Sequence, residues 1–276
     1  MFIGASTGIG RYFPRPSGGG GGASNLLLDD YAGAEMALSL RKLSNAYTGS
    51  AIEVFNGTSL LDIGFVDGEL DTAAIAAHCG GNNGTIRTWY DQSGNGNDFS
   101  QSNSGNQPRI YNGSLGTIYI ENGKPIAQSN GSDFMKTASY TGVSVATSFN
   151  VIQKASNNIL HSHSNQNYTL INHAGHSSTT LSKVVGTPTY FVDGVEQSWV
   201  TRADVGVALG SDNSLLTVLC QTNDAASVMT DMSIGYEAAA SSYPMFSTQE
   251  MIWFNSDKTS DRVAIETAIN SFYSTY

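Results

Sequence analysis

The chain has 276 residues, enough to enclose one full hydrophobic core. Charged residues make up only 13% of the sequence and the net charge is -10, which argues against the phosphate backbone of a nucleic acid as a partner. No apolar run is long enough to cross a bilayer, so we expect no membrane insertion. The first residues lack the basic and apolar regions of a secretion signal, and we expect assembly inside a cell.

The first 24 residues differ in composition from the rest. Pro14 and Pro16 interrupt regular structure, and the run from Gly18 to Gly22 is typical of a flexible segment. We therefore expect two parts: a flexible anchoring arm over residues 1–24 and a globular domain over residues 25–276.

The globular part begins with apolar residues at the spacing of a helix. Met36, Leu40, Leu43 and Tyr47 recur at intervals of three or four residues and predict a short amphipathic helix. A second small helix is predicted over residues 72–78. Short strands are predicted over residues 51–55, 60–65, 85–90, 110–111, 117–120, 143–152, 190–192, 195–197, 216–221, 232–236 and 250–254.

Two features complete the fold prediction. Asp193-Gly194 between two β-prone runs indicates a two-residue hairpin turn. A final helix is predicted from an apolar stripe that includes Ile265 and Ile269, with Ser256 or Ser260 as its cap. Many short strands with regular turns predict an all-β fold, a two-sheet antiparallel β-sandwich with a few short helices, including one at the C-terminus.

The segment Thr88 to Phe99 (TWYDQSGNGNDF) contains the strongest turn signal of the chain. Its polar side chains can hydrogen-bond nearby backbone groups, so the loop can satisfy its own hydrogen bonds at the rim of a sheet. Their oxygen atoms also suit Ca²⁺, which prefers hard oxygen ligands. The candidate calcium ligands are Asp91, Ser93, Asn95 and Asn97.

Aromatic residues suggest a carbohydrate site. Trp89, Tyr90 and Trp199 could stack on the flat apolar faces of sugar rings, although a sandwich core also needs buried aromatics. The polar neighbours of Trp199 predict that its ring is exposed. His161 and His163 would share one strand face and could bind a metal, but a solvent-facing or interface cluster with His173 and His176 explains them equally.

Glycoside hydrolysis needs two carboxylates that converge on one bond. Acidic residues are scattered singly here, and the sequence does not say which of them meet. The residues considered are Glu53, Asp62, Glu121, Asp133, Glu196, Asp231, Glu237 and Glu250.

Several segments resemble laminin-G-like, concanavalin-A-like jelly rolls. The resemblance lies in Asp91 to Phe99, the hairpin YFVDGVEQ from Tyr190 to Gln197, MSIGYE from Met232 to Glu237, and the strand from Glu250 to Asn255 that leads into a helix. It implies a jelly-roll sandwich over most of residues 85–276.

The segment Glu35 to Phe99 is similar to the first part of the catalytic domain of α-L-arabinofuranosidase B enzymes, through Ala46-Tyr47-Thr48-Gly49 and TWYDQSGNGN. That family pairs a cysteine near Cys79 with one just before the strand, and no cysteine occurs among Gly80 to Thr85. No segment matches the family's acidic catalytic motifs, so no catalytic residue is carried over.

The overall layout resembles tail-fibre and virion surface proteins of bacteriophages. We therefore expect a non-catalytic virion component, a tail fibre, adhesin or capsid decoration, that is assembled in the host cytoplasm. Its arm would bind other virion proteins, its jelly roll would contact host surface glycans or neighbouring subunits, and it could form a homotrimer. The alternative from another class is a glycoside hydrolase of the α-L-arabinofuranosidase type.

Overall fold

The structure is a computed structural model that describes residues 25–138, 145–153, 161–162, 189–199, 204, 208–209, 213–221, 232–235 and 247–276. The predicted arm over residues 1–24 lies outside these residues. His163, His173, His176, Asp231 and Glu237 also lie outside them.

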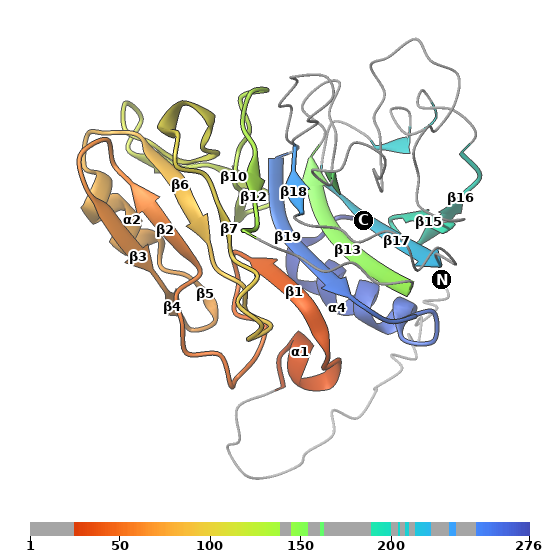
Figure 1. Cartoon of the computed structure of the whole chain (residues 1–276). Coiled ribbons are helices and arrows are strands. Elements are labelled where there is room, and N and C mark those ends of the chain that lie inside the picture. The colour runs from red at the N-terminus through yellow and green to blue at the C-terminus, as the bar shows by residue number, and fades with distance from the viewer. Residues whose placement is uncertain are drawn as a thin grey trace, which may run out of the picture.

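Two antiparallel sheets form the molecule (Figure 1). The six-stranded sheet has the order β1 (Ala34–Ser39), β19 (Ser247–Phe254), β13 (Val145–Gln153), β17 (Asn213–Gln221), β15 (Thr189–Val192) and β16 (Val195–Gln197). The nine-stranded sheet runs β14 (His161–Ser162), β18 (Ser233–Ile234), β12 (Met135–Lys136), β7 (Phe99–Ser100), β6 (Gly84–Trp89), β2 (Ile52–Phe55) and β3 (Leu60–Ile63). Strand β8 (Arg109–Asn112) also pairs with β6 and with β9 (Thr117–Ile118). The prediction of an all-β antiparallel sandwich is confirmed.

Two short β-ribbons and four helical segments complete the described structure. Two ribbons pair β4 (Phe65–Val66) with β5 (Glu69–Leu70) and β10 (Ile120–Glu121) with β11 (Lys124–Pro125). The helical segments are α1 (Leu27–Asp30), α2 (Thr72–Cys79), the 3₁₀ turn η1 (Ser104–Asn106) and α4 (Arg262–Tyr273). None of the helices in the described ranges is long and apolar enough to span a membrane.

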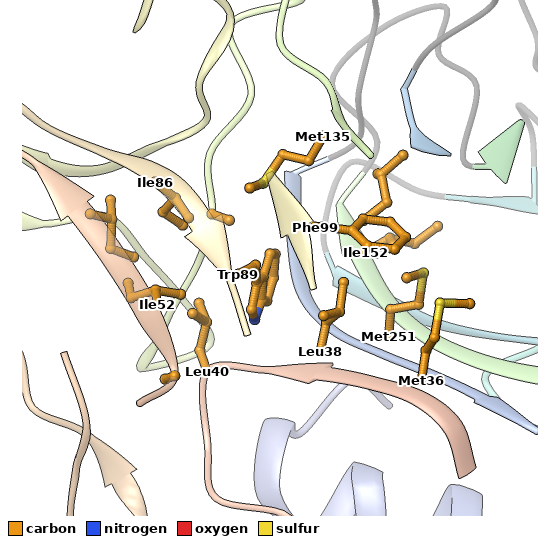
Figure 2. Packing of buried hydrophobic residues seen from close by; sticks show 14 of the residues in the cluster. Met36, Leu38, Leu40, Ile52, Ile86, Trp89, Phe99, Met135, Ile152 and Met251 are labelled. Atoms are coloured by element: carbon orange, nitrogen blue, oxygen red, sulfur yellow. The ribbon is translucent and has the colours of Figure 1, made fainter. Parts of the chain in front are cut away.

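The main core lies between the two sheets (Figure 2). Leu38 of β1 and Met251 of β19 contribute from the six-stranded sheet, while Trp89 of β6 and Phe99 of β7 contribute from the other sheet. Burial of such side chains is the main force that holds the two layers together.

A second core covers the far face of the six-stranded sheet. Ile252 and Phe254 of β19 pack there with Ile265 and Ile269 of α4. Every residue of β19 is buried, because alternate side chains enter one core or the other. The six-stranded sheet is thus covered on both faces.

Two local predictions were wrong. The segment from Met36 forms β1, not a helix, because Met36 and Leu38 enter the main core while Ala37 enters the second core. The apolar residues therefore lie on both faces of a strand, and their spacing also fits a helix by coincidence. Helix α4 has Asp261 at its N-cap with no side-chain cap hydrogen bond, so neither Ser256 nor Ser260 caps it.

The hairpin prediction is confirmed. Strands β15 and β16 pair through Val192 and Val195, and Asp193 and Gly194 form the turn with φ angles of 51° and 79°. Positive φ at both central residues is the geometry of a type I′ turn, which follows the twist of the two strands.

Candidate active site

The nine-stranded sheet presents one face to the main core, and along the described strands from β3 to β12 the side chains of its other face are half-buried or exposed, so we call this the open face. Strand pairing aligns five polar residues across this open face, because directly paired residues point to the same side of a sheet. The row is Asp62, Glu53, Thr88, Ser100 and Lys136, contributed by β3, β2, β6, β7 and β12. Asp62, Ser100 and Lys136 are exposed, while Glu53 and Thr88 are half-buried. Carboxylates, hydroxyls and an ammonium group therefore share one accessible surface.

Tyr90 lies beside this row at the end of β6. Its phenol donates a hydrogen bond of 2.7 Å to Oδ1 of Asp62. Desolvation raises the pKa of Tyr90, and the carboxylates of Asp62, Glu53 and Asp98 raise it further. The phenol therefore stays protonated and acts as a hydrogen-bond donor among three carboxylates.

Glu53 is held in place by its neighbours on β6. The hydroxyl of Thr88 donates a hydrogen bond of 3.0 Å to Oε2 of Glu53. Nε of Arg87 lies 3.9 Å from the same oxygen. These two contacts fix the position of the Glu53 carboxylate on the open face.

Asp98 lies at a depression of about 430 Å³ that opens beside the polar row. Thr88 and Ser100 line it, together with residues 95–98 and 137–138. Desolvation raises the pKa of Asp98, while a 2.8 Å hydrogen bond from the backbone N–H of Asp91 partly offsets this effect. Asp98 thus holds its proton to higher pH than an ordinary aspartate, as a general acid must.

Glu53 and Asp98 flank β6 from opposite sides. Glu53 comes from β2, Asp98 immediately precedes β7, and both strands pair with β6 through Thr88 and Trp89. Adjacent strands lie about 4.8 Å apart, and the register places Asp98 across from Tyr90, so the two backbones are offset by roughly 10 Å across the sheet and roughly 7 Å along it. Carboxyl groups that cleave glycosidic bonds lie about 5 to 10 Å apart. The arrangement places two carboxyl groups of the open face near Thr88, where they can act on a bound sugar.

Both carboxylate oxygens of Asp91 accept hydrogen bonds from the loop or from β1. Oδ1 accepts hydrogen bonds from the backbone N–H groups of Ala37 and Ser93, at 2.8 and 2.9 Å. Oδ2 accepts from the hydroxyl of Ser93 at 2.7 Å and from the backbone N–H of Asn97 at 3.0 Å. The buried carboxylate thus joins the loop to β1 and fixes the position of the neighbouring Asp98.

The two asparagines of the loop make similar contacts. The amide of Asn95 donates to the carbonyls of Ala34 and Glu35, and the amide of Asn97 donates to the carbonyl of Glu35 at 2.8 Å. Within the described ranges, no group of three or more His, Cys, Asp or Glu residues could hold a metal ion. Calcium binding by these residues stays a prediction, and their observed hydrogen bonds satisfy a structural turn.

The three aromatic residues proposed for sugar stacking have different environments. Trp89 is fully buried between the sheets (Figure 2), so its ring offers no face to a sugar. Trp199 is half-buried against the main core, with its ring centroid 4.7 Å from that of Tyr190, and is not the exposed ring we expected. Tyr90 alone of the three lies at the candidate active site.

Asp98 was missed by the sequence interpretation. It follows the polar loop directly and precedes Phe99, which pairs with Trp89. Because side chains alternate along a strand, a buried Phe99 places its neighbours toward the open face. The alternation of side chains could have shown that Asp98 points toward the open face. That Asp98 and Glu53 lie near each other follows only once the order of the strands is known.

Comparison with known proteins gives structural matches only. No family model and no curated protein matches the chain. A GH54 α-L-arabinofuranosidase variant soaked with 4-nitrophenyl α-L-arabinofuranoside matches with a TM-score of 0.57 at 12% identity. A GH54 α-L-arabinofuranosidase soaked with a cyclic sulfate inhibitor gives 0.57 at 13%, and an arabinofuranosidase complexed with arabinofuranosyl-α-1,2-xylobiose gives 0.55 at 14%. Each match covers 87% of this chain, which spans 63% of the length of the other.

These matches correct our expectation of a non-catalytic phage virion component. That expectation rested on the layout of the chain, whereas these three matching structures are arabinofuranosidases. At 12–14% identity, the likeness shows that the chain has the β-sandwich fold found in these arabinofuranosidases.

Proposed function

We propose that this protein is a glycoside hydrolase that acts on α-L-arabinofuranosides through the open face of its nine-stranded sheet. The fold shared with arabinofuranosidases over 87% of the chain supports the reaction class. The observation that carries the proposal is the placement of Asp98 and Glu53 on either side of β6, beside a depression of about 430 Å³.

The two carboxyl groups take different roles. Asp98, whose pKa is raised by desolvation, serves as the general acid that protonates the leaving oxygen. Glu53, hydrogen-bonded to Thr88 and close to Arg87, supplies the second carboxylate. Its negative charge stabilises the positive charge that develops on the sugar ring as the glycosidic bond breaks. Water then bonds to the anomeric carbon and gives its proton to the carboxylate of Asp98, which restores the general acid.

The surrounding groups bind and orient the sugar. The exposed hydroxyl of Ser100 and the ammonium group of Lys136 lie on the same row as Glu53. Hydrogen bonds from such groups to sugar hydroxyls hold the scissile bond between the two carboxyl groups and lower the entropy cost of reaching the transition state. The loop that carries Asp91 keeps Asp98 at the rim of the site.

Hydrolysis of 4-nitrophenyl α-L-arabinofuranoside tests this function. We expect the wild-type chain to release 4-nitrophenol, and Asp98→Asn and Glu53→Gln each to lower kcat/KM by about 100-fold or more, because each removes one proton-transfer or charge-stabilising group. The melting temperature of each variant should stay close to that of the wild type, since both side chains are only half-buried and the carboxamide has nearly the same shape.

Glu196→Gln is the matched control, because it removes a carboxylate from β16, where Glu196 is exposed on the other sheet. It should leave the rate unchanged. A wild-type chain without activity on arabinofuranosides, or carboxamide variants that keep the full rate, would contradict the proposal.

A further inference from the structure

A second depression, of about 280 Å³, lies on the same open face. Its lining residues are Phe55, Leu60, Arg87, Ser102, Ser104 and Gln107. We propose that it is a binding subsite for a sugar that carries a carboxylate, a uronic acid residue, with Arg87 as its anion-binding group. This inference rests on the proposed function, because it places the subsite next to the catalytic carboxylates.

The position follows from the strand register. Phe55 lies two residues beyond Glu53 on β2, and Arg87 immediately precedes Thr88 on β6. Two residues of a strand span about 6.7 Å, which is close to the length of one sugar unit. A sugar in the second depression would therefore neighbour a sugar bound over Thr88.

Arg87 has the capacity to bind an anion. The side chain is 44% exposed, and among the described residues its one recorded charged partner is Glu53, at 3.9 Å from Nε. That distance is too long for a hydrogen bond, so the planar guanidinium keeps its donors for a ligand. Arginine binds carboxylates through two parallel hydrogen bonds, which a hydroxymethyl group on a neutral sugar cannot accept in the same way.

The rest of the depression suits a sugar ring. Half-buried Phe55 and the partly exposed Leu60 form an apolar wall for a ring face, and Ser102 and Ser104 contribute exposed hydroxyls.

The floor of the depression is rigid, because the buried amide of Gln107 is held at both ends. Its Oε1 accepts from the hydroxyl of Thr85 at 2.6 Å, and its Nε2 donates to the carbonyl of Gln101 at 2.7 Å. The chain as a whole has a net charge of -10, so an acidic sugar will bind only where a cation such as Arg87 is locally available.

An NMR titration with a matched ligand pair tests the subsite. Methyl β-D-glucuronide and methyl β-D-glucoside share one ring and differ in the carboxylate. We expect the glucuronide to bind the wild-type chain at least about tenfold more tightly, since one charge-assisted bidentate pair supplies that much. The amide resonances of Ser102 and Ser104 should shift, and the affinity should fall as salt is added.

Variants assign the effect to Arg87. Arg87→Gln should remove the preference for the glucuronide, and Arg87→Lys should keep only the salt-sensitive part of it. Lys42→Gln, which removes a positive charge outside the depression, should change nothing. Equal binding of the two ligands, shifts confined to another surface, or an undiminished preference in Arg87→Gln would each overturn the inference.

Failures of the two proposals are distinguishable. Glucuronide-selective binding in a chain that does not hydrolyse arabinofuranosides would refute the proposed reaction and keep the subsite. Hydrolysis without glucuronide selectivity would refute the subsite and keep the reaction.

Discussion

The two sheets of this molecule use charged side chains in opposite ways. The six-stranded sheet is covered on both faces. The buried acidic residue of β19, Glu250, forms an ion pair with Arg41 inside the protein. The nine-stranded sheet leaves one face open, and its Glu53, Asp98 and Arg87 keep atoms available to a ligand. Charges in the covered sheet therefore hold the fold together, while charges on the open sheet can act on another molecule.

Glu250 shows how completely the covered sheet satisfies a charge. Arg41 donates two hydrogen bonds to it, from Nε at 2.8 Å and Nη2 at 2.9 Å. The hydroxyl of Ser39 donates at 2.7 Å and that of Tyr273 at 3.2 Å. The guanidinium also lies 4.7 Å from the ring centroid of Phe272. This network joins β1, β19 and α4, and no atom of the carboxylate is left for a ligand.

The largest expected effect comes from breaking this network. Glu250→Gln should lower the free energy of unfolding by about 3 to 5 kcal/mol, because it leaves the guanidinium of Arg41 buried without a counter-charge. Urea denaturation measures the change. The exposed Glu196→Gln should stay within about 0.5 kcal/mol of the wild type. A loss below about 1 kcal/mol in Glu250→Gln would show that the covered sheet does not depend on this pair.

Asp133 is a buried carboxyl group next to the nine-stranded sheet, and its environment differs from that of Glu250. It precedes β12, is fully buried, and its Oδ1 has no hydrogen-bond partner in the described structure, while Oδ2 accepts from the backbone N–H of Asn130 at 2.7 Å. Desolvation raises the pKa of Asp133 to about 6, and the hydrogen bond and the charge of Arg109 only partly oppose this. Unlike Glu250, this carboxylate lacks a matched partner.

The pH dependence of stability follows from that pKa. The unfolded chain has the ordinary value of 3.8 and the folded chain a value of about 6, so the folded state binds the proton more tightly. The contribution of Asp133 to stability is therefore greatest below pH 3.8, falls as the pH rises toward 6, and is constant above that. We expect the total loss to be about 1 to 3 kcal/mol.

Asp133→Asn tests this contribution, because an amide of the same shape carries no charge. The variant should be more stable than the wild type at pH 8 by about 1 to 3 kcal/mol, and the difference should disappear below pH 4. Thermal denaturation across this pH range measures it. A variant that is less stable than the wild type at pH 8 would mean that the ionised Asp133 is matched after all.

Much of the fold could be predicted from the sequence because local signals were strong. The hairpin at Asp193-Gly194, helix α2 and helix α4 follow from turn chemistry and apolar spacing. Strand β1 was mistaken for a helix because it lies between two cores, where both faces are apolar and the usual alternation with polar residues is lost.

The candidate active site was less accessible to sequence interpretation. Tyr90 was identified from its aromatic ring, but Asp98 was not, and Glu53 was one of many scattered acids. Their convergence depends on the register of β2 and β7 against β6, which includes a β-bulge between Glu53 and Val54. Such long-range pairing is set by the whole sheet, and no local pattern specifies it.

The most direct test is a crystal structure of Glu53→Gln soaked with 4-nitrophenyl α-L-arabinofuranoside. The account predicts that the arabinofuranosyl ring lies over Thr88 in the depression next to Asp98, with the glycosidic oxygen within hydrogen-bond distance of that carboxyl group. A sugar bound on another surface, with the open face of the nine-stranded sheet empty, would contradict it.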